Sequence, residues 1–395
     1  MYPRHLTLPD VPIDTRRRSV DRSIQMRVMG IDPSSVRWRI VALFLLTWPP
    51  LAVLTAVDGL AMGKGVSIGV PLLSDYAVLA RFLIAVPLLV YADALIRKRA
   101  VDLCQYLRQS GIVTDADAPA FEQLAERFSW LRDSNLARVA TGAAAVLSAA
   151  FLRLEFAGDV STWQFVAGAD GATRSAAGWW YLFVSIPTFH FLFGLGLWRY
   201  LVWCWFLFRI SRLDLALVPT HPDRSAGLTI VGTVHQYHGM VVCALSSIVS
   251  AHIGLELVKG GWSMPAFRLQ LGTFVVMVLI GLLVPLLAFM PRLMDARKRG
   301  LIEYGVLAGD YTRAFHRKWI GRTAPADETL LGSADVQSLA DLANSFEVIH
   351  DMRIVPFELR TIVAILVWTA LPLVPLAFIV FSPIDVIKGL VRIVL

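Results

Sequence analysis

Ionisable residues recur within one long apolar segment, and their spacing is the clearest indication of chemistry in the chain. Residues 229–258 contain three histidines and one glutamate: His235, His238, His252 and Glu256. On a helix that turns ~100° per residue, these side chains share one stripe roughly 100° wide. Because histidine titrates near neutral pH, such a stripe would suit a polar pathway or a proton relay. The alternative is a buried helix whose imidazoles each bond to a backbone or hydroxyl group.

Three further ionisable residues lie within apolar segments, where a charge is costly unless it has a partner. They are Arg81, Asp93 and His190. Asp75 and Glu256 are both expected near the outer side of the membrane, so either is a candidate ion-pair partner for Arg81. A second interpretation is that Arg81 binds a transported anion. We predict that these three residues belong to an ion or solute pathway together with the four residues above.

A metal site is a weaker interpretation of the histidines. His221 and Asp223 precede the same segment, and His235 and His238 have the i, i+3 spacing that lets two imidazoles share a metal ion. No cysteine pair accompanies them, and no His-Glu-x-x-His motif occurs. We therefore expect no metal and no cofactor. The sequence also lacks a phosphate-binding Gly-rich loop, a Gly-x-Ser-x-Gly motif and a dinucleotide fingerprint, so an enzyme is the least favoured class.

The composition places these residues in a membrane protein. Of the 395 residues, 56% are apolar and 17% are charged, whereas about a quarter are charged in a typical soluble domain. Seven apolar runs approach or exceed the ~20 residues needed to cross ~30 Å of hydrocarbon. They lie near residues 40–60, 75–96, 136–153, 177–203, 229–258, 269–291 and 361–381. Long, continuous runs of Leu, Ala and Val favour helices, and no strands are predicted.

The distribution of positive charge predicts the orientation. Segments 1–37, 97–138, 209–228 and 292–360 contain 27 of the 37 Lys and Arg residues, and the segments that alternate with them contain seven. The positive-inside rule then places the N-terminus in the cytoplasm and, with seven spans, the C-terminus outside. The same rule explains the net charge of +7 without a nucleic-acid partner. We expect a multi-pass protein of the plasma membrane, or of the inner membrane in a Gram-negative bacterium, with the lipid bilayer as its partner.

The predicted fold is all-α, with about seven transmembrane helices and two cytoplasmic helical hairpins. A shared signature suggests a 3+1+3 parallel internal repeat. Val-Pro-Leu-Leu at 86–89 is followed by Arg-Lys-Arg at 97–99, and Val-Pro-Leu-Leu at 284–287 is followed by Arg-Lys-Arg at 297–299. Transporters are often built from such repeats. Chance recurrence of a short apolar motif is the alternative.

Nine segments follow from this prediction. They are a flexible basic cytoplasmic tail (1–36), transmembrane helices 1 and 2 (37–96), a cytoplasmic hairpin (97–135), helices 3 and 4 (136–211), a cytoplasmic loop (212–228), helices 5 and 6 (229–291), a second cytoplasmic hairpin (292–360), helix 7 (361–381) and an interfacial amphipathic helix (382–395).

Apolar stripes along the second hairpin are candidates for an interaction surface. Their most prominent members are Tyr304, Tyr311, Phe315, Leu339 and Phe346. Residues at this spacing share one helix face, so the stripes are expected to pack on each other or on a partner. A homo-oligomer and a cytoplasmic protein partner are therefore both open. The favoured function is a channel or transporter for an ion or small solute, and the alternative is a membrane-anchored sensor or assembly factor that acts through its hairpins.

Overall fold

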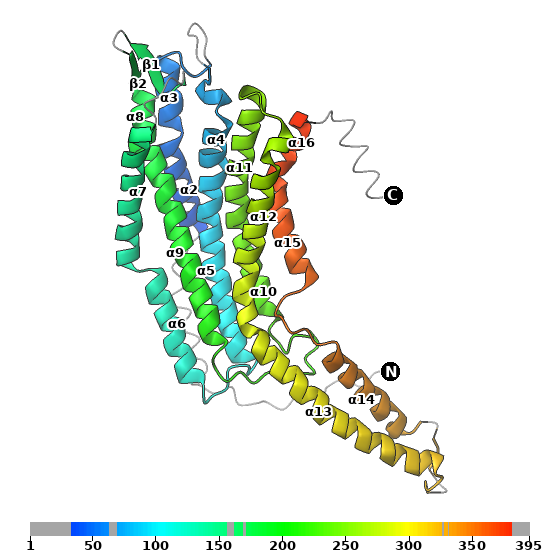
Figure 1. Ribbon diagram of the computed structural model, residues 1–395. Coiled ribbons are helices and arrows are strands. Elements are labelled where there is room, and N and C mark those ends of the chain that lie inside the picture. Colours follow the sequence, from blue (N-terminus) through cyan, green and yellow to red (C-terminus); the bar gives the residue numbers. More distant parts are fainter. Residues whose placement is uncertain are drawn as a thin grey trace, which may run out of the picture.

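The computed structural model describes residues 33–62, 69–155, 162–168, 171–325, 328–330 and 332–380. These residues form a bundle of long helices, with a helical hairpin projecting from one end (Figure 1). Most of the predicted tail lies outside the described residues, and only 33–36 belong to the first helix. The predicted interfacial helix at 382–395 lies outside them entirely.

Six helical stretches of the described chain are long and apolar enough to cross a membrane, as expected for a multi-pass integral membrane protein. They are Ser34–Val57, Tyr76–Gln109, Ala176–Ile210, Thr229–Lys259, Met264–Ile320 and Leu359–Ile379. They are built from α2 (Pro33–Thr47), α3 (Pro49–Val57), α4 (Tyr76–Leu79), α5 (Val86–Gln109), α8 (Ala176–Trp180), α9 (Ile186–Ile210), α10 (Thr229–His235), α11 (Gly239–Lys259), α12 (Arg268–Leu283), α13 (Met290–Phe315), α15 (Leu359–Ala370) and α16 (Val374–Val380), of which α2 and α16 each extend one residue beyond their stretch. Large apolar side chains are exposed along the bundle, which is typical of helices that lipid covers.

The predicted third span, 136–153, falls within α7 (Asn135–Glu155), which is not among these six stretches. Many Ala, Gly, Thr and Ser residues lower its apolar content. α7 nevertheless lies along α9 and returns the chain to the end of the bundle where α8 begins (Figure 1). Small residues let the two helices approach closely, since a Cβ added at Gly194 would lie 3.4 Å from Thr141 Cγ2. The count of seven crossings stays a prediction.

Two membrane segments contain a π-helical turn ahead of a proline. The turns are Ala80–Ala85 before Pro87 and Tyr181–Ser185 before Pro187. Proline has no N–H to donate, so changes in the helical hydrogen-bond ladder are expected at these places. The two turns contact each other, because the Arg81 guanidinium donates to the Tyr181 hydroxyl over 2.5 Å.

A third proline changes the hydrogen bonding where α12 meets α13. Pro285 lies in a 3-10 segment, Val284–Phe289. Because proline has no N–H, the Gly281 carbonyl loses its helical donor. The Tyr200 hydroxyl of α9 donates to this carbonyl instead, and the bond ties α9 to α12.

The end of the bundle that carries α8 contains an element that the sequence does not predict. β1 (Phe165–Gly168) and β2 (Gly171–Arg174) pair antiparallel, with Phe165 opposite Arg174. The Arg174 guanidinium carbon lies 4.7 Å from the centroid of the Phe165 ring. The expectation of no strands is therefore wrong for this loop. Four residues per strand are too few to produce an alternating pattern that stands out from the apolar surroundings.

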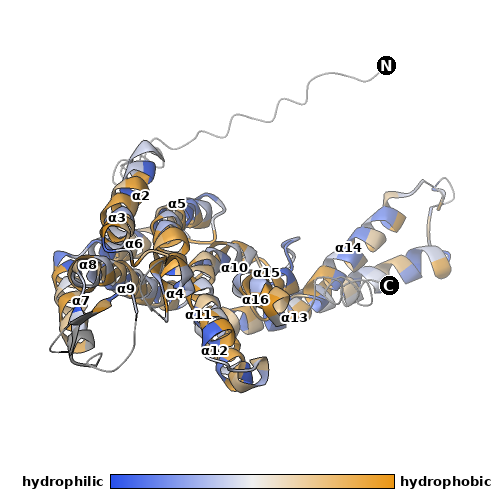
Figure 2. Ribbon diagram, turned by 90° about the horizontal axis from the view of Figure 1, so that it is seen from above, coloured by the Kyte–Doolittle hydropathy of each residue, from blue (hydrophilic) through white to orange (hydrophobic). Residues whose placement is uncertain are grey.

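The two predicted hairpins differ in how they meet the bundle. α6 (Ala118–Arg132) packs against α9, whereas α14 (Ala334–His350) packs against α13 and extends away from the bundle (Figure 2).

The two Val-Pro-Leu-Leu signatures also differ in structure, because the first starts the regular helix α5 and the second forms the start of the 3-10 segment. The 3+1+3 repeat stays a prediction.

The apolar stripes of α13 and α14 face each other. The Tyr311 hydroxyl donates to the Asp335 carbonyl over 3.1 Å, and a Cβ added at Gly305 would lie 3.7 Å from the Phe346 ring. The five residues predicted to form an interaction surface are all half-buried: Tyr304, Tyr311, Phe315, Leu339 and Phe346. The exposed apolar residues of α13 are others, among them Val306.

Candidate functional site

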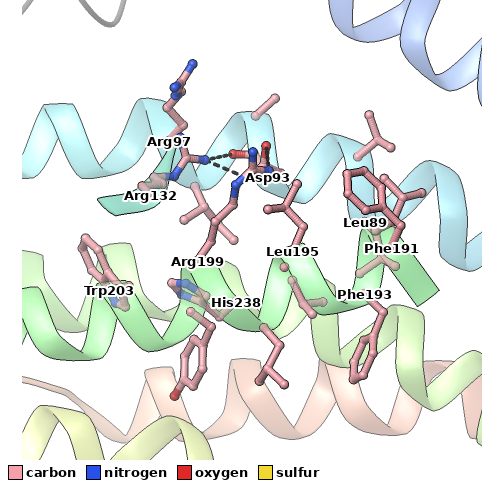
Figure 3. A pocket seen from close by; sticks show the side chains of 18 of the residues that line it. Leu89, Asp93, Arg97, Arg132, Phe191, Phe193, Leu195, Arg199, Trp203 and His238 are labelled. Atoms are coloured by element: carbon pink, nitrogen blue, oxygen red, sulfur yellow. Dashed lines mark hydrogen bonds and ion pairs between the residues drawn. The ribbon is translucent and has the colours of Figure 1, made fainter. Parts of the chain in front are cut away.

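A cavity of about 730 Å³ lies among the membrane helices (Figure 3), and residues at the end of α6 belong to its lining. Its walls come from α2, α5, α9, α11 and α12, and from the neighbouring ends of α6 and α7. Five arginines and two aspartates line it: Arg39, Arg97, Arg132, Arg138, Arg199, Asp93 and Asp133. The volume falls within the ~300–1,000 Å³ that is typical of small-molecule pockets.

Asp93 of α5 is the centre of the charged lining. Its Oδ1 accepts a hydrogen bond from Arg132 Nη2 over 2.6 Å, and its Oδ2 pairs with Arg199 Nη1 at 2.8 Å. Arg132 also donates to the Asp93 carbonyl over 3.2 Å. One turn further along α5, Arg97 pairs with Asp133. A single carboxylate thus links α5, α6 and α9 (Figure 3).

Positive charge exceeds negative charge in the cavity lining by three, because the lining includes five arginines and two aspartates. Arg132 is only 5% exposed. Burial lowers its pKa to about 10, although the Asp93 carboxylate acts in the opposite direction, so Arg132 stays protonated at neutral pH. Arg199 Nε is buried and has no hydrogen-bond partner among the described residues. Excess positive charge and an unused donor both favour an anionic ligand.

Contacts between α6 and α9 fix the position of Arg132. The Phe128 and Phe206 rings stack with their centroids 4.5 Å apart. Trp198 Nε1 donates to the Leu131 carbonyl over 2.9 Å, next to Arg132 in the chain. Arg132 is the last residue of α6, where a cation also interacts favourably with the partial negative charge of the helix end.

The other end of the cavity is apolar. Leu89, Phe191 and Phe193 line it, away from the arginine cluster (Figure 3). Leu89 also belongs to a buried cluster that includes Phe82 and Trp163, neither of which is exposed. This cluster separates the cavity from the end of the bundle that carries β1 and β2.

Of the predicted pathway histidines, His238 lines the cavity, and His235 packs beside it with the ring centroids 5.2 Å apart. Trp203 Nε1 donates to His235 Nδ1 over 3.0 Å, so the imidazole proton of His235 is on Nε2. His238 Nδ1 lies 3.0 Å from the His235 carbonyl. His238 and Trp203 therefore line the cavity, and His235 contacts both of them without lining it.

Three other predicted pathway residues do not line the cavity. His190 lies between α9 and α7, where its Nδ1 is 2.6 Å from Ser148 Oγ. His252 is exposed and Glu256 is half-buried further along α11. A 3-10 turn, Gln236–His238, directly follows His235 and contains His238, so the regular ~100° spacing does not hold between His235 and the rest of the stripe. The four residues of the predicted stripe do not share one environment.

Arg81 lies within the buried cluster that closes the cavity. Its guanidinium carbon is 5.4 Å from the centroid of the Phe189 ring, and its Nε is buried without a partner among the described residues. The expected ion pair with Asp75 or Glu256 is not formed in the part of the chain that the structure describes. Asp75 instead accepts a hydrogen bond from Trp163 Nε1 over 3.1 Å. Like Arg199, Arg81 is thus a positively charged residue whose Nε–H group donates no hydrogen bond among the described residues.

Local sequence patterns do not single out the arginines of the cavity or its second aspartate. Arg39 and Arg199 lie within or beside predicted spans, and an intramembrane charge is the signal that could have identified them. Arg97, Arg132 and Arg138 belong to segments whose positive charge the topology already explains. Their convergence depends on how α2, α6 and α7 pack around α5 and α9.

Two of the four weak metal candidates, His221 and Asp223, lie in the loop before α10, whereas His235 and His238 lie at the cavity. The residues that the structure describes contain no group of three or more His, Cys, Asp or Glu residues placed to hold a metal ion. His221 Nδ1 lies 2.8 Å from Asp223 Oδ1. Burial raises the pKa of Asp223, but hydrogen bonds from the amides of Gly227, Ser225 and Thr229 together outweigh burial and hold this pKa below its ordinary value.

Arg353 stabilises the loop that contains His221 and Asp223. Its Nη2 donates to the Asp223 carbonyl over 2.6 Å and pairs with Glu358 at 3.0 Å, and its amide donates to the Arg224 carbonyl over 2.7 Å. Arg224 and Ala226 have φ of 53° and 51°, a left-handed conformation that is unfavourable for residues other than glycine. The strained turn before α10 is therefore held by the segment that precedes α15.

Comparison with known proteins assigns the chain to no family. No protein-family model, no curated protein and no solved structure matches the chain. The inference of function therefore depends on the cavity and its charges.

Proposed function

We propose that this integral membrane protein is a transporter for a small organic anion, and that the arginine-lined cavity is its binding site. The observation that supports the proposal most is the excess of three positive charges on the wall of a cavity of about 730 Å³ among membrane helices. Arg39, Asp93 and Arg199 lie on helical stretches that can span a membrane, where charged residues are costly to keep and usually mark a substrate or ion pathway.

The proposed orientation places the α6 end of the bundle in the cytoplasm of a cell bounded by a plasma membrane, with the N-terminus on the same side. The Lys- and Arg-rich segments 97–138 and 292–360 support it, since such loops stay inside. We also propose that α7 is a seventh crossing, because the chain leaves α6 at one end of the bundle and enters α8 at the other (Figure 1).

A transporter is favoured over an open channel because packed side chains lie between the cavity and the far side. The buried cluster around Phe82 and Trp163 occupies this position. Passage therefore requires the helices to move, and π-helical turns are places where a helix changes its hydrogen-bond register. Two such turns meet at Arg81 and Tyr181. Arg81 lies roughly 18 Å from Asp93 along the helix axis, and it would receive the anion next.

Counterflow in proteoliposomes tests the proposal. The full chain is reconstituted and assayed with radiolabelled carboxylates, sulfonates and phosphate esters. Arg199→Gln is expected to lower anion flux by about tenfold or more, because a hydrogen bond to a charged group is lost. Arg209→Gln is the matched control, since Arg209 lies on the same helix, is exposed and is not part of the cavity wall. Equal flux in Arg199→Gln and wild type, or equal flux of organic cations, would contradict the proposal.

A second candidate function is a sensor or assembly factor that acts through the α13–α14 hairpin. The observation in its favour is a group of exposed apolar residues on α13: Ile302, Val306 and Leu307 are 59%, 61% and 52% exposed. They lie on an arm that extends away from the bundle (Figure 2). If this function holds, Val306→Glu disrupts a complex isolated from membranes and leaves anion flux unchanged. A monomeric protein without a partner would weaken it.

A further inference from the structure

We infer that the transported anion is a single-chain amphiphile, with a carboxylate or phosphate head and an alkyl tail. This inference rests on the proposed function and names the substrate class of the same cavity. It requires a charged end that holds the head, an apolar end that holds the tail, and space that a small hydrophilic anion would not fill.

The two ends of the cavity differ in chemistry. Arg97, Arg132 and Arg199 gather around Asp93 at one end, and the far end is lined by Leu89, Phe191 and Phe193 (Figure 3). A hydrated inorganic anion would meet the arginines but leave the apolar walls in contact with water. An alkyl chain on the same head would cover these walls, which is favourable because apolar surface leaves water.

The size of the cavity also exceeds what a small anion needs. A volume of about 730 Å³ is far above the ~10–15 Å³ that a single water molecule needs in such a cavity. Two glycines keep part of this volume open. A Cβ added at Gly196 of α9 or at Gly281 of α12 would meet nothing within 4 Å. Glycine weakens a helix, so its presence twice on this wall is consistent with a need for space.

The cavity reaches the surface of the bundle at membrane depth, between α9 and α12. Leu197 lines the cavity and is 48% exposed, and Gly281 lines it from α12 and is exposed too. The bond from Tyr200 to the Gly281 carbonyl holds the two helices side by side here. An apolar rim on membrane helices is accessible to an alkyl chain that lies in the bilayer.

Photoaffinity labelling tests the inference on the full chain in phosphatidylcholine nanodiscs. The probe is decyl phosphate with a diazirine at the end of its chain, and labelled residues are identified by mass spectrometry. Hexyl, octyl and decyl phosphate, inorganic phosphate and decanol are the competitors. Because each buried methylene raises affinity roughly fourfold, competition should strengthen by this factor per methylene from hexyl to decyl phosphate.

Two variants that fill the cavity separate specific binding from partition into lipid. Gly196→Leu and Gly281→Leu place a side chain in the open space from opposite walls. Gly272→Leu is the matched control, because Gly272 is exposed on α12, has nothing within 4 Å of an added Cβ and does not line the cavity. All variants are first checked by gel filtration and thermal unfolding. If one of the two filling variants misfolds, the other still tests whether the probe binds in the cavity.

The expected result is labelling at Phe191 or Phe193 that decyl phosphate removes and that a filling variant reduces at least tenfold, while Gly272→Leu labels like wild type. Labelling confined to lipid-facing residues such as Leu136 would overturn the inference. If inorganic phosphate competes as well as decyl phosphate, the inference fails but the proposed anion transport stands. If decanol competes as well as decyl phosphate, both fail, because the charged head then contributes nothing.

Discussion

The Asp93 carboxylate on α5 lies 2.8 Å from the Arg199 guanidinium on α9, and this ion pair joins two membrane helices at the cavity wall. The other oxygen of the same carboxylate holds Arg132 of α6. One negative charge therefore positions two positive charges and neutralises only one of them. The remaining charge is available to an anion without breaking an ion pair.

Removal of this carboxylate is predicted to destabilise the bundle. Arg132 is 5% exposed, and in Asp93→Asn it loses its closer counter-charge and keeps only Asp133 at 3.9 Å. Loss of one partner from a buried ion pair costs about 3–5 kcal/mol, and since the Asp93 side chain is 30% exposed, we expect about 3 kcal/mol. Chemical unfolding in detergent measures the change. Asp102→Asn is the control, because its pair with Arg99 is exposed and is worth at most ~1 kcal/mol. Equal losses in the two variants would contradict the prediction.

Tyr200 and Pro285 are predicted to be energetically coupled. Tyr200→Phe removes the donor to the Gly281 carbonyl and should cost about 1 kcal/mol of unfolding free energy. In a Pro285→Ala background, the alanine amide supplies a helical donor to the same carbonyl, so Tyr200→Phe should cost close to nothing. A double-mutant cycle on unfolding free energies measures the coupling. The same cost in both backgrounds would show that Pro285 does not create the need for Tyr200.

Acid should weaken the loop before α10 through Asp223. The folded-state pKa of Asp223 lies below its ordinary value because amide hydrogen bonds outweigh burial. Its stabilising contribution is therefore fully present above the unfolded pKa of about 4 and is lost as the pH falls through the folded pKa. Midpoints of thermal unfolding between pH 7 and pH 3 should fall less steeply below about pH 4 in Asp223→Asn than in wild type. Parallel curves would contradict this prediction.

The α13–α14 hairpin is predicted to open when a charged side chain is introduced among the apolar residues that lie between the two helices. Phe346→Glu places a carboxylate against Gly305 between the two helices, where its desolvation is unfavourable. Spin labels at the exposed positions Thr312 and Gln337 report the separation of the arms. We expect a longer and broader distance distribution for Phe346→Glu. Val306→Glu, on an exposed position, should leave it unchanged. An unchanged distance in both variants would mean that the stripe does not hold the hairpin.

Sequence periodicity and length predict the membrane helices because each span must satisfy its own backbone and cover ~30 Å of hydrocarbon. Six of the predicted apolar runs overlap, to within three residues at each end that extends beyond, with stretches long and apolar enough to span. The run at 136–153 is helical but richer in small residues, which pack against α9 rather than raise hydropathy. The strands β1 and β2 leave no comparable pattern, because each has only four residues and the two form a separate two-stranded sheet.

The candidate site is less visible in the sequence, and the reason is the distance between its parts along the chain. Asp93 and His238 belong to the predicted pathway and line the cavity. The charge of Arg132 is already explained by the topology, and the intramembrane charge of Arg199 does not by itself show which residues it meets. The ion pairs that gather them span 39 residues for Arg132 and over a hundred for Arg199. Helix packing, rather than spacing within one helix, brings these side chains together.

The most direct test of transport is whether the cavity becomes accessible from both sides of the membrane. Gly196→Cys is introduced after Cys104, Cys204 and Cys243 are replaced, and a membrane-impermeant thiol reagent is added to sealed vesicles of either orientation. We predict modification from the side that carries the α13–α14 hairpin without substrate, and from the opposite side as well when a transported anion is present. Modification from the hairpin side alone under every condition would contradict transport and leave the cavity as a binding site only.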